Sequence, residues 1–471
     1  MVALSPMPAL LNHRDALGPQ FGRFAKLPGA NRLIHTGVGL VYLFFFLSIY
    51  RDYVSYVWGY AGFRFRVLEA WEVIFIAAGV ALVSFAMPQR LLRPSAIVIW
   101  LMYAFFYVPT MAMTFMIGDF PSGEYIAPLG ALTMMMVAIS VVSQLPMRAG
   151  RTVEMMPGRA FVLTILVLFA AITVLQYIMY REIISFASVE DVYYQRFAAS
   201  ELGGGPVGYA RTHYYYVISP TLVAIGLCSR RYRLLLPFGI AGFIFTYMID
   251  ASKIALVVPL AMIALYWIAV KTPIGVNLFT GGLTFLTFVC SLFTSQVSFI
   301  RFIADLMIVR SISSPAQTYH QYYDLFTQRG YTWWSNVSGI RQLVPPPSGF
   351  AHDPAWPTLG LIIGREYYGS TLMNANANPF SGEGVAAAGT LGVVIIGLFM
   401  AGWLRAFDLA ARGWNRVFAL LIAAPLGLCL TNVHLSTLLV SFGGIFWLAV
   451  LSLHKPGPRI YQPDGGGGAP Q

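Results

Sequence analysis

The chain has 471 residues, of which 58% are hydrophobic and 10% are charged. Soluble domains carry about 25% charged residues, so this composition excludes an ordinary soluble protein and predicts an integral membrane protein. The formal net charge is +11, but many basic residues are placed as membrane orientation signals, which argues against a nucleic-acid partner.

Twelve apolar runs are long enough to cross a bilayer, because one crossing needs about 20 residues. They lie near residues 33–50, 69–87, 95–117, 124–144, 159–180, 212–229, 233–250, 253–270, 275–297, 383–404, 416–433 and 435–453. The sequence therefore predicts an all-α polytopic membrane protein with about 12 transmembrane helices.

The positions of Lys and Arg predict how these spans are oriented. If the N-terminus is cytoplasmic and the spans alternate, every short inside connection holds a basic residue. The short outside links near 118–123 and 434 hold none. This pattern satisfies the positive-inside rule and predicts that both termini are cytoplasmic. Long outside loops escape the rule, so we expect their arginines to serve a ligand.

The predicted topology divides the chain into five segments. They are a basic cytoplasmic segment over 1–32, transmembrane helices 1–9 over 33–297 with an outer loop at about 181–211, a large outer loop with amphipathic helices over 298–382, transmembrane helices 10–12 over 383–453, and a disordered cytoplasmic tail over 454–471.

The outer loop 298–382 contains a strong helix signal. Ser314 suits the N-cap, Pro315 the first helical position, Gln317 a capping box, and Gly330 the end of the helix. Aromatic residues then share one face and polar residues the other: Tyr319, Tyr322, Tyr323 and Phe326 against Gln317, His320, Gln321, Asp324 and Gln328. This pattern predicts a helix at a water–apolar boundary with polar groups facing a site. A helix that only covers other protein is the alternative.

Four residues are candidates for acid–base chemistry. His320 and Asp324 are four residues apart, so they share a helix face, and a carboxylate that orients a histidine can make it a general base. An exposed polar face also gives such pairs by chance. Glu383 at a helix start and Asp191 in the first outer loop are the other candidates.

Five basic residues on the outer side are candidates for binding phosphate groups. They are Arg196, Arg211, Lys253, Arg301 and Arg310. The guanidinium group is a rigid fork of donors that matches phosphate oxygens. Pairing with a nearby carboxylate is the alternative for the arginines, and an ion pair with Asp250 is the alternative for Lys253.

Tyrosine and asparagine residues on the outer side suit the hydroxyls of a sugar. The candidates are Tyr193, Tyr319, Tyr323, Asn374, Asn376 and Asn378. An interfacial aromatic belt and turn formation are the alternatives. The chain has no GxxxxGK[ST] motif, no GxSxG motif and no clustered metal-ligand spacing. We therefore expect no metal and no cofactor.

A set of these residues, taken in order, resembles bacterial Wzy-type polymerases, the O-antigen and exopolysaccharide repeat-unit polymerases. The resemblance covers about residues 185–405 and is carried by Asp191, Tyr193, Arg196, Gly208, Tyr209, Pro220, Gly226, Asp250, Ser252, Lys253, Arg310, Ser314 to Ala316, Tyr319, Tyr322, Tyr323, Asn374 to Phe380, Glu383, Gly384, Gly389 and Gly392.

The resemblance implies a GT-C-like glycosyltransferase at the periplasmic face of the bacterial inner membrane. Such enzymes transfer the growing glycan from undecaprenyl diphosphate to a hydroxyl of an incoming lipid-linked repeat unit. A chain-length regulator and export machinery are the implied protein partners. Two other readings stay open: an O-antigen ligase or another lipid-linked sugar transferase, and a flippase or transporter. The asymmetric loops and the outer position of the ionisable groups argue against a transporter.

Overall fold

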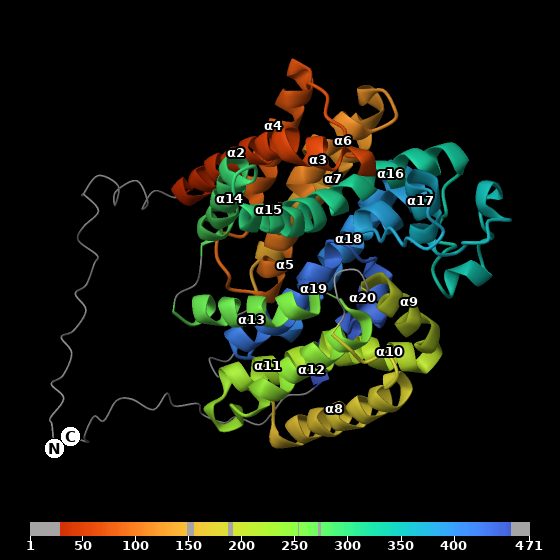
Figure 1. Ribbon diagram of the computed structural model, residues 1–471. Helices are drawn as coiled ribbons and strands as arrows, with labels where there is room; N and C mark the ends of the chain where they lie inside the picture. The colour runs from red at the N-terminus through yellow and green to blue at the C-terminus, as the bar shows by residue number, and fades with distance from the viewer. Residues whose placement is uncertain (1–28, 148–154, 187–191, 253, 272–274, 454–471) are drawn as a thin grey trace, which may run out of the picture.

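The computed structural model describes residues 29–147, 155–186, 192–252, 254–271 and 275–453 (Figure 1). Helices make up 77% of the structure, and its described residues form no β-strand. The predicted all-α class is therefore confirmed. The predicted segments 1–32 and 454–471 lie largely or wholly outside the described residues, as do Asp191 and Lys253.

The helical elements follow one another along the whole chain. In order they are α2 (Ala30–Ile49), η1 (Tyr50–Val54), α3 (Ser55–Val57), η2 (Gly59–Ala61), α4 (Ala70–Ala86), α5 (Pro94–Met102), η3 (Tyr103–Tyr107), α6 (Val108–Ile117), α7 (Ser122–Gln144), α8 (Arg159–Tyr180), α9 (Val192–Leu202), α10 (Gly205–His213), η4 (Tyr214–Ile218), α11 (Ser219–Cys228), η5 (Arg230–Tyr232), α12 (Leu235–Asp250), α13 (Ile254–Lys271), α14 (Val276–Phe293), α15 (Ser298–Ile303), η6 (Ala304–Ser313), α16 (Ser314–Arg329), η7 (Ile340–Gln342), η8 (Ser348–Phe350), α17 (Leu359–Tyr368), η9 (Pro379–Val385), α18 (Ala386–Ala410), α19 (Arg416–Leu430), α20 (Leu435–Val440) and α21 (Gly444–Leu453).

Each of the twelve predicted spans falls on helical chain, although the last is divided between α20 and α21. Among the described residues, six helices are long and apolar enough to cross a membrane: Ala30–Val57, Pro94–Ile117, Ser122–Gln144, Arg159–Tyr180, Val276–Phe293 and Pro379–Ala410. Further apolar helices of 10–17 residues accompany them. Membrane character is therefore supported, and the count of twelve stays a prediction.

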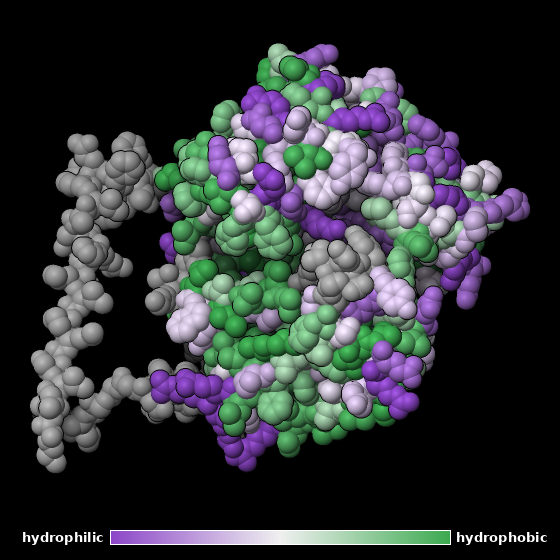
Figure 2. Space-filling model, viewed as in Figure 1, coloured by the Kyte–Doolittle hydropathy of each residue, from purple (hydrophilic) through white to green (hydrophobic). Residues whose placement is uncertain are grey.

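Apolar side chains cover much of the outside of the helical bundle. Leu163, Leu260 and Phe285 are each more than half exposed on helices that are otherwise apolar. Figure 2 shows apolar residues over the middle and much of the lower part of one face, with hydrophilic residues gathered at the top and right and in a further group at the lower left edge. An apolar lateral surface with polar ends is what a lipid-embedded bundle requires.

The connections between helices fall into two groups. Within each group, the connections contact one another. On the predicted inner side, the backbones of Arg90 and Gly275 form an isolated antiparallel bridge. The Arg405 side chain donates to the carbonyl of Pro146 at 2.9 Å. On the predicted outer side, Arg66 donates to the Ser122 hydroxyl at 2.7 Å. These contacts group the loops as the predicted alternation does. Which group faces the cytoplasm stays a prediction.

The predicted start of the polar helix is wrong, and its predicted end is confirmed. Ser313 already has helical dihedrals (φ −75°, ψ −39°), so α15, η6 and α16 run on without a break and Ser314 is not an N-cap. Its hydroxyl instead donates to the Val309 carbonyl at 2.9 Å. Gly330 ends the helix with φ 105°, a conformation that favours glycine.

The predicted position of α16 at a water–apolar boundary is also wrong. All twelve residues of 315–326 are buried, on the polar face as well as on the aromatic face. Helices α6, α17 and α18 and segment η9 surround α16, and Figure 1 shows it among helices from distant parts of the chain. The first part of the predicted outer loop is therefore a buried helix of the bundle.

The grouping of the loops predicts which cysteines a membrane-impermeant reagent will reach from one side. We expect Tyr60→Cys and Leu372→Cys to react with a charged maleimide in intact cells, because both positions are exposed on the predicted outer group. Leu92 is also more than half exposed, on the predicted inner group, so Leu92→Cys should react only after the membrane is opened. Labelling of all three in intact cells would contradict this grouping.

Candidate functional site

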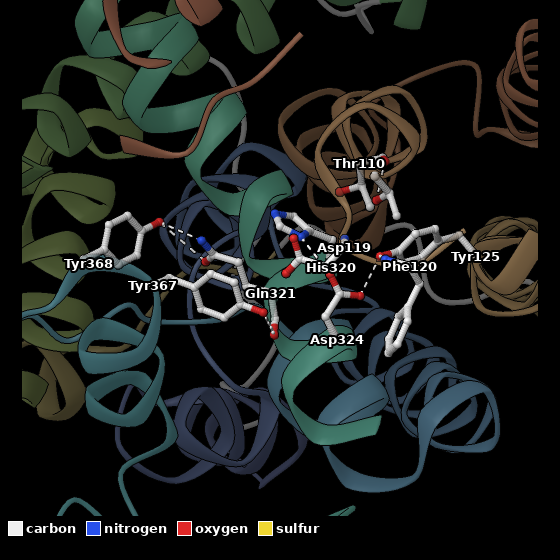
Figure 3. Close-up of polar contacts among 10 residues, drawn as sticks. Thr110, Asp119, Phe120, Tyr125, His320, Gln321, Asp324, Tyr367 and Tyr368 are labelled. Carbon is white, nitrogen blue, oxygen red and sulfur yellow. Dashed lines mark hydrogen bonds and ion pairs between the residues drawn. The ribbon is translucent and has the colours of Figure 1, made fainter. Parts of the chain in front are cut away.

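A buried carboxylate on α16 forms the centre of a polar cluster. Asp324 is fully buried, and its Oδ1 accepts a hydrogen bond from the Tyr125 hydroxyl at 2.6 Å. Its Oδ2 accepts from the backbone N–H of Asp119 at 3.0 Å and lies 3.2 Å from His320 Nδ1 (Figure 3). A buried carboxylate is costly unless donors surround it, so these three bonds hold it in place.

The carboxylate determines how His320 can react. An ionised carboxylate only accepts hydrogen bonds, so the network assigns the proton of His320 to Nδ1 and leaves a lone pair on Nε2. The residue is 4% exposed, and Nε2 has no hydrogen-bond partner among the described residues. A neutral histidine oriented by a carboxylate, with its other nitrogen free to accept a proton, has the geometry of a general base.

Helix α17 covers this histidine. The Tyr367 ring lies edge-on to the His320 ring at 6.3 Å, and its hydroxyl donates to the Gln321 carbonyl at 3.2 Å. Tyr368 accepts from the Gln321 amide at 3.0 Å and donates to Gln317 at 3.1 Å. Burial raises the pKa of Tyr367 well above its usual value, and the carboxylates of Asp324 and Asp119 raise it further. Tyr367 therefore stays protonated.

Wide helical turns of the π type border α16. Segments η6, η3 and η9 all contact it. The Phe106 ring in η3 lies 6.1 Å from Tyr319 and stacks on Phe380 of η9 at 6.0 Å. Such turns are rare and concentrate at functional sites, so their arrangement supports α16 as the centre of the site.

The other described candidate acid, Glu383, has a supporting position. It is 2% exposed, and its oxygens accept from the N–H groups of Leu435 at 2.6 Å and Ser436 at 3.0 Å. These bonds fasten η9 to the start of α20. His434 packs against Gly382 beside this carboxylate. Burial lowers the pKa of His434, and Glu383 acts in the opposite direction.

The described candidate cations lie on two stretches of the chain. Arg196 donates to the carbonyls of Asp250 at 3.3 Å and Ala251 at 3.2 Å, at the C-terminal end of α12, which is predicted to face outward. Arg211 donates to the Ala199 carbonyl at 3.2 Å and lies 5.7 Å from the centre of the Tyr180 ring. The structure brings these two arginines to one bundle of helices, α8 to α12.

The other two candidate cations lie on the helix that leads to His320. Arg301 in α15 donates to the Thr294 and Ser295 carbonyls at 3.3 and 3.4 Å, and Arg310 is exposed in η6. Their helix continues directly into α16. One continuous helix therefore connects Arg301 and Arg310 to the pair of His320 and Asp324, called the dyad below.

The buried candidate sugar-binding residues, Tyr319, Tyr323 and Asn378, make hydrogen bonds to nearby backbone groups. The Tyr319 hydroxyl donates to the Pro128 carbonyl at 2.9 Å, and the Tyr323 hydroxyl donates to the Glu124 carbonyl at 3.3 Å. Asn378 is buried, and its side chain accepts from Ser381 N–H at 3.0 Å. Asn374 and Asn376 are exposed. The Tyr193 side chain lies outside the described part of the chain.

Sequence reasoning missed the residues that complete the cluster: Asp119, Tyr125, Tyr367 and Tyr368. The available signal was the Gly-Asp pair at 118–119 in a short outside link. The spacing of these residues from His320 and Asp324 gives no local pattern, because Tyr125 and Asp324 are 199 residues apart.

An ion pair holds α17 to the loop before it. Arg365 forms a two-point contact with Asp353, one bond of which measures 3.0 Å. Burial alone would raise the pKa of Asp353, but the bonds from Arg365 and from the Ala355 N–H outweigh it and hold this pKa below its usual value. The pair therefore stabilises the fold only while Asp353 is ionised.

This ion pair predicts a pH-dependent loss of stability. In the unfolded chain the Asp353 carboxyl titrates at about pH 3.9, and in the folded protein its pKa is lower. The stability that the ion pair contributes is therefore complete above the unfolded pKa and falls as the pH drops from there through the folded pKa. We expect the melting temperature of Asp353→Asn to lie below that of the parent at pH 6 and the difference to shrink towards pH 3. The pair of Arg329 and Glu366, with side chains 37% and 36% exposed, offers Glu366→Gln as a control with a smaller effect. A pH-independent difference would contradict the assignment.

Comparisons with known proteins give no match to a family model, to a curated protein or to a solved structure. The family resemblance of the sequence therefore stays an expectation. The site rests on its own geometry: a buried Asp–His pair, two covering tyrosines and a surrounding set of π-type turns.

Proposed function

We propose that the chain is a membrane glycosyltransferase that joins lipid-diphosphate-linked oligosaccharide repeat units at the outer face of a bacterial inner membrane. The observation that carries the proposal is the buried dyad, in which Asp324 holds His320 and Nε2 is free to take a proton. The resemblance to Wzy-type polymerases supplies the substrate class, with undecaprenyl diphosphate as the carrier.

The dyad performs the proton transfer that glycosyl transfer needs. His320 Nε2 takes the proton of the acceptor hydroxyl while the hydroxyl oxygen forms a bond to the anomeric carbon of the donor. The bond between that carbon and the diphosphate oxygen breaks, and the diphosphate leaves with the electron pair. Because Nε2 is buried, the acceptor reaches it when the side chains around it, which include Tyr367 edge-on to the His320 ring, move aside.

Fixed cations stabilise the charge that develops on the leaving diphosphate. Arg301 and Arg310 lie on the continuous helix that carries His320, and Arg196 and Arg211 lie at the outer end of α12. The proposal includes twelve spans in a GT-C-like arrangement and cytoplasmic termini. It also includes functional contact with a chain-length regulator and export machinery.

Removal of His320 tests the role of the dyad. In cells deleted for the gene and complemented with His320→Ala, we expect surface glycan to fall by about 10²- to 10⁴-fold, as for loss of a general base. Gel separation of the glycans should show single repeat units capped on lipid. His213→Ala is the matched control, because the bond that His213 makes within the described part of the chain is to the Tyr209 carbonyl of its own helix.

Other outcomes of the deletion point to other functions. Complete polymer stranded on its carrier would indicate a ligase, and repeat units trapped in the cytoplasmic leaflet would indicate a flippase. Full-length surface polymer in cells that carry His320→Ala would reject the proposed role of the dyad.

Replacement of Arg310 tests the phosphate contact. Lys at this position keeps the positive charge but loses the two-point donor fork, so we expect Arg310→Lys to shorten the polymer sharply. Arg341→Lys on the same outer segment is the control, since Arg341 is exposed in η7. Normal-length polymer in cells with Arg310→Ala would remove Arg310 from the site.

A further inference from the structure

The link between α6 and α7 forms a wall of the His320 site that the mechanism above does not use. Its residue Asp119 donates its backbone N–H to Asp324 at 3.0 Å, and the N–H of Phe120 donates to the Tyr125 hydroxyl at 3.0 Å. Gly118 lies directly beneath Tyr125, and a Cβ at this position would overlap the Tyr125 ring. Glycine at 118 therefore lets Tyr125 reach across the link to Asp324.

The Asp119 backbone is bonded to Asp324, whereas its side chain is exposed to solvent. The Asp119 carboxylate takes no hydrogen bond or ion pair from the described part of the chain. Several other acids on the predicted outer side do have donors, among them Asp52 on Arg51, Asp305 on Tyr53 and Trp58, Asp353 on Arg365, and Glu366 on Arg329. The fold holds the backbone of Asp119 firmly and leaves its carboxylate available.

The carboxylate also lies within reach of the dyad. Asp119 and Asp324 both act electrostatically on Tyr367, the residue that covers His320. Figure 3 shows Asp119 and Asp324 together at the His320 ring, with Thr110 nearby on α6. His320 Nε2 and Thr110 Oγ1 are both buried without a partner among the described residues. An unsatisfied buried nitrogen on His320 and an exposed carboxylate on the link that contacts Asp324 indicate a place for a polar ligand.

We propose that Asp119 is a substrate-contacting residue, whose carboxylate accepts hydrogen bonds from hydroxyls of the acceptor sugar and directs one hydroxyl to His320 Nε2. A carboxylate accepts two hydrogen bonds at once, which suits neighbouring hydroxyls of a saccharide. The inference rests on the proposed glycosyl transfer and assigns the acceptor side of that site to the α6–α7 link.

Asp119→Asn tests this assignment. The amide keeps the size of the side chain and the backbone N–H to Asp324, but it loses the charge and one acceptor oxygen. Loss of a charge-assisted hydrogen bond to the acceptor should reduce polymer formation about 10- to 100-fold. The measurement is the length distribution and amount of surface glycan in deleted cells complemented with each variant, at matched protein levels.

Glu124→Gln is the matched control, because Glu124 is an exposed acid five positions further along and its substitution changes the net charge equally. Normal polymer with Glu124→Gln and short polymer with Asp119→Asn would support the proposal. Normal polymer with Asp119→Asn, or equal losses in both variants, would overturn it. Full-length polymer with His320→Ala would instead reject the proposed function, so the two failures are distinguishable.

Thermal unfolding of the purified protein separates contact with substrate from support of the fold. Asp119→Asn and Asp119→Ser both keep the backbone N–H, so we expect both to melt at the temperature of the parent. If both variants melted several degrees lower, the side chain would be holding the fold, and the assignment to substrate would be overturned.

Discussion

A polar helix enclosed in an apolar bundle has to satisfy its polar groups inside the protein, and the structure around α16 follows from this constraint. Water and lipid headgroups cannot reach a fully buried carboxylate or amide, so each needs a protein partner. Asp324 takes its donors from α7 and the α6–α7 link, Gln317 donates to the Ala61 carbonyl at 2.9 Å, and Gln321 bonds to α17. The polar face of one helix thereby contacts four other parts of the chain: α7, the α6–α7 link, Ala61 and α17.

The same constraint makes the exception informative. Nearly every polar group on α16 has a partner, yet His320 Nε2 has none among the described residues. A buried polar atom without a partner costs about 1–3 kcal/mol, which a fold retains where the atom is needed for something else. The bonds that hold Asp324 in the fold also orient His320, because Asp324 is bonded to the His320 ring.

Irregular backbone near the site is satisfied by protein in the same way. The longest apolar helix is broken at Ala388 and Gly389, which removes the helical bonds to the carbonyls before the break. The N–H groups of Thr332 and Trp333 donate to the carbonyls of Ala386 and Ala387 at 2.9 Å and replace those bonds. These two bonds connect the segment after α16 to the start of α18. Backbone outside regular helices is tolerated at membrane depth only with such partners.

The sequence by itself determined the membrane class, the helical character of the twelve apolar runs, the end of α16 at Gly330 and the shared face of His320 and Asp324. These properties depend on composition and on residues within a turn or two of each other. Only the tertiary structure decided that the polar face of α16 is buried and that Tyr125 and Asp119 hold the carboxylate. It also decided that Glu383 and Asn378 bond to nearby backbone, that Arg196 and Arg211 bond to backbone carbonyls within α9 and at the end of α12, and that Arg301 and Arg310 lie on the helix that leads to His320. Helical periodicity shows which side chains share a face, but what covers that face comes from distant segments: α17, 46 residues on from Gln321 at Tyr367, and the α6–α7 region, 199 residues before Asp324 at Tyr125.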